Sequence, residues 1–230
     1  MALRYSAAAI VGLDHTCYRD IHNGQTAWVV GSGASLNHID PSFFADKWVM
    51  AVNYAGTTLG LPHFYSVSHH HSDADTIARY RPDLTVFTTE VEQLPDSDRS
   101  KHPAVQPNVV RVPTTTQRYS AWNPETDWPS DPDVLTIGPS SIHLTMHLAA
   151  YMGAAHIVLV GADCGEFDDT SRVTNYEHPD GHLHYGIWTG ALEAMARKLR
   201  SLGVGVHSLN PWVTPRLEGH RYRTDGLVIN

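Results

Sequence analysis

Short apolar segments alternate with breaks rich in glycine, proline, serine and aspartate along most of the chain. Apolar segments of this length, with few polar positions inside them, are typical of strands buried on both faces in a parallel sheet. The segments predicted to be strands are 27–31, 48–52, 63–68, 84–88, 109–112, 156–161 and 205–209.

Between these strands the pattern predicts helices at 41–47, 73–80, 142–152 and 189–202. Ser140 and Ser141 precede the third helix as a cap, Gly153 follows it as a stop, and Gly203 ends the fourth. Because strands and helices alternate, the chain predicts an α/β fold, with a mostly parallel sheet, crossover connections and helices on both faces.

The length of 230 residues predicts one domain with a substantial core. We expect an N-terminal extension over 1–25 and a single domain over 26–230. The polar, proline-rich segment 113–132 contains Tyr119, Trp122 and Trp128, and its length predicts a lid over a ligand. The alternative is that these aromatic side chains anchor the segment to the core.

The composition argues against some classes of protein. The formal net charge of −8 argues against a generic binder of nucleic-acid backbones, although it leaves open a local basic patch that binds nucleic acid. Cys17 and Cys164 are the two cysteines, which fits a reducing, cytoplasmic compartment, and neither a signal peptide nor a membrane span is expected. The sequence leaves open whether the chain forms a homo-oligomer. Of the 16 histidines, three form the run 69–71, which predicts a solvated helix start; contact with a phosphate when the imidazoles are charged is the alternative.

The turn after the first predicted strand is the first candidate for ligand binding. Gly31, Ser32 and Gly33 permit a tight turn whose N–H groups can face an anion, and Ser35 is predicted to cap a short helix. The turn lacks both the third glycine of a dinucleotide fingerprint and the Gly-Lys-Ser/Thr of a P-loop, so a purely structural turn is the alternative. In a parallel sheet ligands bind beyond the carboxyl ends of the strands, where this turn and the Ser140-Ser141 cap are expected to meet.

Four segments together resemble a known family. They are 30–36 (Val-Gly-Ser-Gly-Ala-Ser-Leu), 52–53 (Val-Asn), 136–141 (Thr-Ile-Gly-Pro-Ser-Ser) and 152–163, which ends in Val-Gly-Ala-Asp. Their order and spacing are similar to glycosyltransferase family 42, the bacterial sialyltransferases. The same skeleton resembles the motility accessory factor proteins of flagellin glycosylation and the archaeal 6-hydroxymethylpterin pyrophosphokinases. The resemblance implies a Rossmann-like domain with a lid.

The resemblance also implies a site for a nucleotide-linked sugar, which is CMP-linked in the sialyltransferases. Asn53 matches a nucleotide-binding asparagine, whereas Ser32 and Ser66 stand where that family has two further asparagines. Ser140 and Ser141 match a Thr-Ser pair at a helix start, which favours a phosphate. The alternatives are a turn-forming asparagine and an ordinary helix cap.

The resemblance places the chemistry just before the last predicted helix. His182 follows a glycine, as the family's general base does, while His184 lies closer in a strict count of residues. Tyr176 and Tyr185 match tyrosines that bind the leaving phosphate. Asp163 matches the family's Gly-x-Asp and would orient a histidine or a sugar hydroxyl, with a structural aspartate as the alternative.

Three functions remain open from the sequence. The first is a glycosyltransferase that passes a sugar from a nucleotide-linked donor to a soluble hydroxyl acceptor. The second is a pterin-type pyrophosphokinase, which would need magnesium and carboxylates such as Asp163, Asp168 and Asp169. The third is an inactive accessory protein that binds a nucleotide or a sugar. A zinc site at His182 and His184 is not expected, since no further ligand has suitable spacing.

Overall fold

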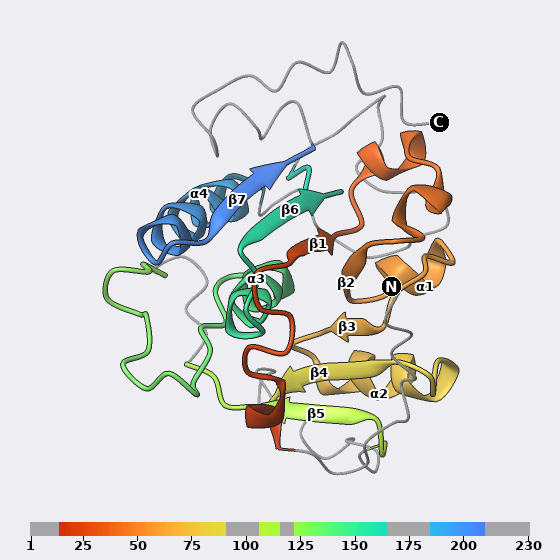
Figure 1. The fold of residues 1–230 in the computed structure, drawn as a ribbon, viewed down its shortest axis with the longest axis horizontal. Coiled ribbons are helices and arrows are strands. Elements are labelled where there is room, and N and C mark those ends of the chain that lie inside the picture. Colours follow the sequence, from red (N-terminus) through yellow and green to blue (C-terminus); the bar gives the residue numbers. More distant parts are fainter. Residues whose placement is uncertain (1–13, 91–105, 116–121, 165–184, 210–230) are drawn as a thin grey trace.

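The structure, a computed structural model, describes residues 14–90, 106–115, 122–164 and 185–209. Within this part of the chain, seven strands form one sheet in the order β5-β4-β3-β2-β1-β6-β7, and each neighbouring pair is parallel (Figure 1). The strands are β1 (Thr26–Val30), β2 (Trp48–Val52), β3 (Tyr65–Val67), β4 (Thr85–Thr89), β5 (Val109–Val112), β6 (His156–Val160) and β7 (Gly205–Ser208). The predicted α/β fold with a parallel sheet is confirmed.

The sheet reverses its direction of growth at one place. From β1 the chain adds β2 to β5 successively on one side, and it then places β6 and β7 on the other side of β1. In open parallel sheets such a switch point leaves space beyond the carboxyl ends of the two strands that flank it, and ligands bind there. The boundary between β1 and β6 is therefore the position that the topology favours for a site.

Helices and helical turns lie on both faces of the sheet. The α-helices are α1 (Ala55–Thr58), α2 (His71–Tyr80), α3 (Ser141–Tyr151) and α4 (Tyr185–Ser201). The 3-10 helices are η1 (His15–Tyr18), η2 (Ala34–His38) and η3 (Pro41–Phe44). Successive residues of a strand point to opposite faces, so Val29 joins the core under α3 and α4, while Val30 joins a second core under η2 and η3.

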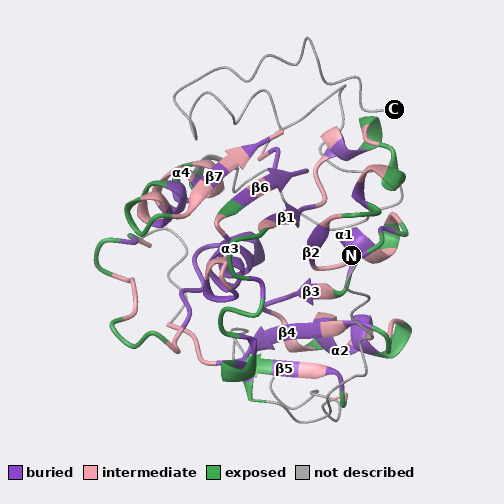
Figure 2. Cartoon of the chain, in the orientation of Figure 1, coloured by how far each residue is buried: buried purple, intermediate pink, exposed green. Residues whose placement is uncertain are grey.

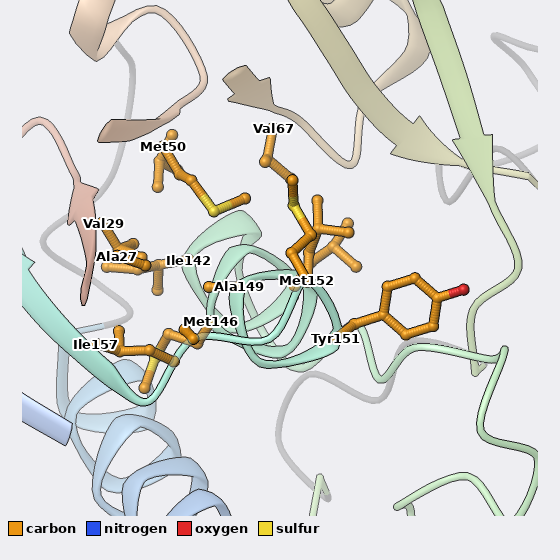
Figure 3. Close-up of a cluster of buried hydrophobic side chains, with 14 of the residues drawn as sticks. Ala27, Val29, Met50, Val67, Ile142, Met146, Ala149, Tyr151, Met152 and Ile157 are labelled. Carbon is orange, nitrogen blue, oxygen red and sulfur yellow. The ribbon is translucent and has the colours of Figure 1, made fainter. Parts of the chain in front are cut away.

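Helix α3 is the centre of the larger core. Figure 3 shows Met146, Ala149 and Met152 facing strand residues such as Val29 and Met50. Almost all of its side chains are buried, as the purple colour of α3 in Figure 2 shows. A helix buried on nearly all sides needs protein around it, and here the sheet, α4 and the segment 122–136 contact it.

The ends of α3 follow the predicted signals. Ser140 is the N-cap residue and forms a capping box with His143. Gly153 follows the helix with a φ of +93°, and a Cβ there would lie 2.8 Å from the Cα of Asn23. Glycine is therefore required both by the backbone angle and by the close approach of the chain near Asn23.

The connection between β1 and β2 differs from the prediction. Instead of one helix over 41–47, it contains the two 3-10 helices η2 and η3, and the short α1 after β2 was not predicted. Asp40 caps η3 by accepting a hydrogen bond from the Ser42 N–H, and Pro41 takes the first helical position. Tight turns of this kind carry little periodic pattern, so hydrophobic spacing does not reveal them.

The described part of the predicted N-terminal extension, residues 14–25, packs against the sheet. Tyr18 is buried in the larger core and packs edge-on against Phe87, with 4.9 Å between ring centroids. The His22 ring stacks on the Trp48 ring with 4.0 Å between centroids, and the backbone N–H of His22 donates to the Met152 carbonyl. Residues 14–25 therefore cover the amino end of the sheet.

The described part of the predicted lid is docked on α3. Trp122 packs on His143 and donates its indole N–H to Thr136 Oγ1 at 3.1 Å. Trp128 packs on His147, whose Nδ1 accepts the Thr136 N–H at 2.8 Å. These contacts match the alternative in which the aromatic residues anchor the segment, and movement of the segment stays a prediction.

The two α3 histidines predict a pH-dependent stability. Burial lowers the pKa of His143 to about 4 and that of His147 to about 3. As the pH falls below the ordinary histidine value near 6.5, the unfolded chain gains protons that the folded protein excludes. The free energy of unfolding should then fall by about 1.4 kcal/mol per histidine for each pH unit.

Urea unfolding of the His147→Asn variant between about pH 7 and 5 checks this expectation. The asparagine side-chain oxygen takes the position of Nδ1 and can still accept the Thr136 N–H, but the amide takes up no proton. The free energy of unfolding of the variant should therefore decline less steeply with acidification than that of the unchanged protein. It should still decline, because the variant retains the other buried histidines. Equal slopes in the two proteins would contradict a neutral, buried His147.

Candidate functional site

The glycine-rich turn after β1 packs against the turn after β6. The Gly31 N–H donates to the Val160 carbonyl and the Gly33 N–H to the Gly161 carbonyl, both at 2.8 Å. A Cβ on Gly31 would lie 2.5 Å from the Gly161 carbonyl oxygen. The contact between the two turns therefore explains both glycines, which is the structural alternative that the sequence left open.

Asp163 ties the same two turns together through its side chain. Its carboxylate accepts the Ser35 N–H at 2.7 Å and the Ser35 hydroxyl at 2.6 Å, and the residue is 8% exposed. Ser35 itself lies inside η2, and Gly33 occupies the N-cap position, so the prediction that Ser35 caps the helix is wrong. The side-chain cap comes instead from Asp163, which lies 128 residues later in the chain, after β6.

Asn53 has an unusual backbone conformation at the end of β2. Its φ is +50°, in the left-handed region that few residues other than glycine and asparagine adopt. Its backbone is held by β3, because its N–H donates to the Val67 carbonyl and its carbonyl accepts the Ser66 hydroxyl. The side-chain oxygen of Asn53 is covered from solvent and meets no donor in the described part of the chain.

The two serines predicted to replace asparagines have different surroundings. Ser66 is completely buried, and its hydroxyl donates to the Asn53 carbonyl at 2.9 Å, so it can affect a ligand through Asn53. Ser32 lies half-buried in the turn between Gly31 and Gly33. A contact between either serine and a nucleotide stays a prediction.

The N-terminus of α3 meets the end of β3. The Ser140 hydroxyl and N–H both contact His143 Nδ1, at 3.0 and 3.3 Å, so the predicted cap is confirmed. Ser141 is 2% exposed, and its oxygen accepts the His69 N–H at 3.3 Å and lies 2.6 Å from His69 Nδ1. Any contact of this helix end with an anion would involve the Ser141 backbone more readily than its buried hydroxyl.

His69 lies in this region in surroundings that differ from those predicted. The run 69–71 predicted a solvated helix start, but His69 is buried and α2 begins at His71. The Thr89 hydroxyl donates to the His69 carbonyl, while His71 Nε2 lies 2.7 Å from the Thr89 carbonyl. The useful signal was the position of His69 directly after a predicted strand, where parallel sheets present ligand-facing residues.

Cys164 follows Asp163 and is a structural thiol. Burial raises its pKa to about 12, even though a hydrogen bond with Thr189 acts in the opposite direction. A thiol with such a pKa is almost wholly protonated near neutral pH and is a poor nucleophile. The contact with Thr189 also shows that the first turns of α4 lie beside the end of β6.

The predicted catalytic segment is only partly described. His182, His184 and Tyr176 lie outside the described residues, and Tyr185 is the first residue of α4. Within the described ranges, no group of three or more histidine, cysteine, aspartate or glutamate side chains is placed to hold a metal ion. In the same ranges, no helix is both long and apolar enough to cross a membrane.

The chain has a remote likeness to a solved glycosyltransferase structure. No protein-family model matches the chain, and no curated protein matches it. Among solved structures, it is similar to the MAf glycosyltransferase from Magnetospirillum magneticum AMB-1, with 13% sequence identity and a TM-score of 0.46. The similarity covers 91% of this chain and 37% of that one, so this chain spans well under half the length of that protein.

The packing of the two turns predicts that Gly31→Ala destabilises the protein. The added methyl group would meet the backbone oxygen of Gly161, which cannot move without disturbing β6. Overpacking of this kind costs about 1–3 kcal/mol, and denaturant unfolding measures it.

Gly190→Ala is the matched control. Gly190 lies in α4, and among the described residues no atom outside its own helix lies within 4 Å of the position that a Cβ would take there, so alanine should raise stability by about 0.5–1 kcal/mol. If Gly31→Ala were as stable as Gly190→Ala, the close contact between the two turns would be refuted.

Proposed function

We propose that this protein is a transferase that binds a nucleotide-linked sugar near the carboxyl ends of β1 and β2 and passes the sugar to a hydroxyl acceptor. Asn53 carries the proposal. Its backbone is left-handed, and its buried side-chain oxygen meets no donor in the described part of the chain. A bound ligand accounts for both features, since strained backbone and unpaired buried polar atoms are concentrated at functional sites. A base or ribose edge supplies the missing donor, and the side-chain N–H₂ can donate in return.

The surroundings of Asn53 support a nucleotide at this place. Strands β6, β1, β2 and β3 are neighbours in the sheet, so their ends span about 14 Å, a length suited to a nucleotide with its phosphates. The N-terminus of α3 lies at the end of β3, and its positive dipole end favours a phosphate group. The topological switch between β1 and β6 is the usual position for such ligands.

In the proposed reaction the acceptor oxygen attacks the anomeric carbon of the sugar. The bond from that carbon to the phosphate oxygen breaks as the new bond forms, and His182 or His184 takes the proton of the acceptor hydroxyl. Tyr176 and Tyr185 donate hydrogen bonds to the departing phosphate. Support comes from the sequence, since His184 directly precedes α4, and from the contact of Thr189 in α4 with Cys164 after β6.

The Asn53→Gly variant tests the proposed nucleotide site. Glycine adopts the φ of +50° without strain, so this substitution removes the amide while the turn is preserved. We expect a specific rise in thermal stability of the unchanged protein with one of CMP, UDP, GDP or ATP. Calorimetry on Asn53→Gly should then give at least about tenfold weaker binding, as expected for the loss of a buried hydrogen-bonding group.

Two results would count against this site. One is unchanged nucleotide affinity in a folded Asn53→Gly protein. The other is a loss of affinity in Asn53→Ala alone, because alanine strains the turn and would then act through folding. Comparing the stability and the affinity of both variants separates the two effects.

The histidine base is tested by kinetics. His182→Ala should lower turnover by about two to four orders of magnitude with little change in donor affinity, since a base acts in the transition state. If His184→Ala causes the loss instead, the two roles exchange. Full activity in both variants would refute a histidine base.

The same assays distinguish the alternative functions. A transferase releases a free nucleotide when donor and acceptor are both present. A pyrophosphokinase would depend strictly on magnesium, and an accessory protein would bind the nucleotide without turnover.

A further inference from the structure

His69 joins three elements at the carboxyl edge of the sheet. It lies two residues after β3, and its carbonyl accepts the hydroxyl of Thr89, the last residue of β4, at 3.3 Å. Its backbone N–H and its Nδ1 both contact Oγ of Ser141, the first residue of α3, at 3.3 and 2.6 Å. Both His69 and Ser141 are buried. His69 therefore fixes where α3 begins relative to the ends of β3 and β4.

The two contacts restrict what the Ser141 hydroxyl can offer to a ligand. A hydroxyl group has one hydrogen to donate and two acceptor positions, and the backbone N–H of His69 takes one of these positions. If Nδ1 of His69 carries no proton, the hydroxyl donates its hydrogen to Nδ1 and keeps one acceptor position. If Nδ1 carries a proton, it donates to the hydroxyl oxygen, so both acceptor positions are taken and the hydrogen is left for another acceptor.

A phosphate group at the start of α3 would need hydrogen-bond donors. The N–H groups of a first helical turn have no partner within the helix, and the helix dipole favours an anion there. Because Ser141 is 2% exposed, a phosphate would meet these N–H groups first, and the hydroxyl would add to them only when its hydrogen is left to donate. The negative charge of a phosphate also favours a proton on a nearby imidazole. A phosphate would therefore select the arrangement in which Nδ1 of His69 carries the proton.

Other titratable side chains lie close to His69. The ring centroid of His70 lies 3.9 Å from that of His69. His71 begins α2, and Asp73 lies in the first turn of this helix. His69 is the histidine whose ring contacts Ser141, so it is the group through which a proton can act on the start of α3.

We propose that His69 is a positioning residue for the phosphate of the nucleotide-linked donor. Its Nδ1 carries a proton when the phosphate is bound, and the Ser141 hydroxyl then donates its hydrogen to a phosphate oxygen. This inference rests on the proposed nucleotide site, and in it His69 acts through Ser141. Because the interaction concerns the phosphate and not the base, it distinguishes a nucleotide from its nucleoside.

Calorimetry on the full chain tests this role with matched pairs of ligands, namely CMP and cytidine, UDP and uridine, and GDP and guanosine. His69→Ala should weaken nucleotide binding at least about tenfold, as expected for a lost hydrogen bond to a charged group, while the affinity for the nucleoside is unchanged. Ser141→Ala should have the same effect. The double variant should bind no more weakly than either single variant, because both changes remove the same interaction.

His156→Ala is the matched control, since it removes an exposed histidine at the amino end of β6 and should leave both affinities unchanged. His69→Asn separates the proposed role from a general effect on folding. The asparagine N–H₂ can take the place of a protonated Nδ1 and donate to Ser141 Oγ, so this variant should retain most of the affinity for the nucleotide.

Nitrogen NMR spectroscopy of the imidazoles gives a direct readout. Nδ1 of His69 should carry a proton in the complex with the nucleotide, and the signal is identified by its loss in His69→Asn. The role of His69 is overturned if Nδ1 carries no proton in this complex, or if nucleotide and nucleoside affinities fall equally in His69→Ala.

A comparison with Asn53→Gly distinguishes this inference from the proposed function. Full nucleotide affinity in His69→Ala, together with weakened binding in Asn53→Gly, would overturn the role of His69 and leave the proposed nucleotide site in place. If the unchanged protein bound none of the three nucleotides, both proposals would fail.

Discussion

Asp163 accepts two hydrogen bonds from Ser35, and this contact holds the turn after β1 against the turn after β6. The switch point of the sheet lies between these two strands, so there the chain must close two turns side by side. Gly31 and Gly33 make the approach possible, because a side chain on either would strike the other turn. The carboxylate also caps η2, so the same group shapes the start of the β1–β2 connection.

The rest of the site is built outward from this contact by neighbouring strand ends. The Asn53 backbone is held in its left-handed turn by Val67 and Ser66 of β3. His69, two residues beyond the end of β3, then contacts Ser141 at the start of α3. Each strand end thus positions the next, which is how a parallel sheet brings distant segments to one edge.

Helix α3 joins this edge to the body of the protein. Its first turn carries the Ser140–His143 capping box, and its buried length packs on the central strands. His143 and His147 are neutral inside the core, and each supports a tryptophan of the segment 122–136. A movement of that segment over a ligand would have to separate these ring contacts first, which makes its described part a firm anchor.

The sequence by itself determined the order and type of the main elements. Buried strands such as β2 and β4 carry a strong local signal in their apolar runs, and helix α3 carries one in its N-cap serine and in Gly153 after its end. It also placed Asn53 at the end of β2 and the paired serines at the start of α3, as the structure has them. Only the tertiary structure decided that Gly31 serves packing, that Asp163 caps η2 and that the buried His69 contacts Ser141. These facts depend on contacts between segments far apart in the chain, which local patterns do not encode.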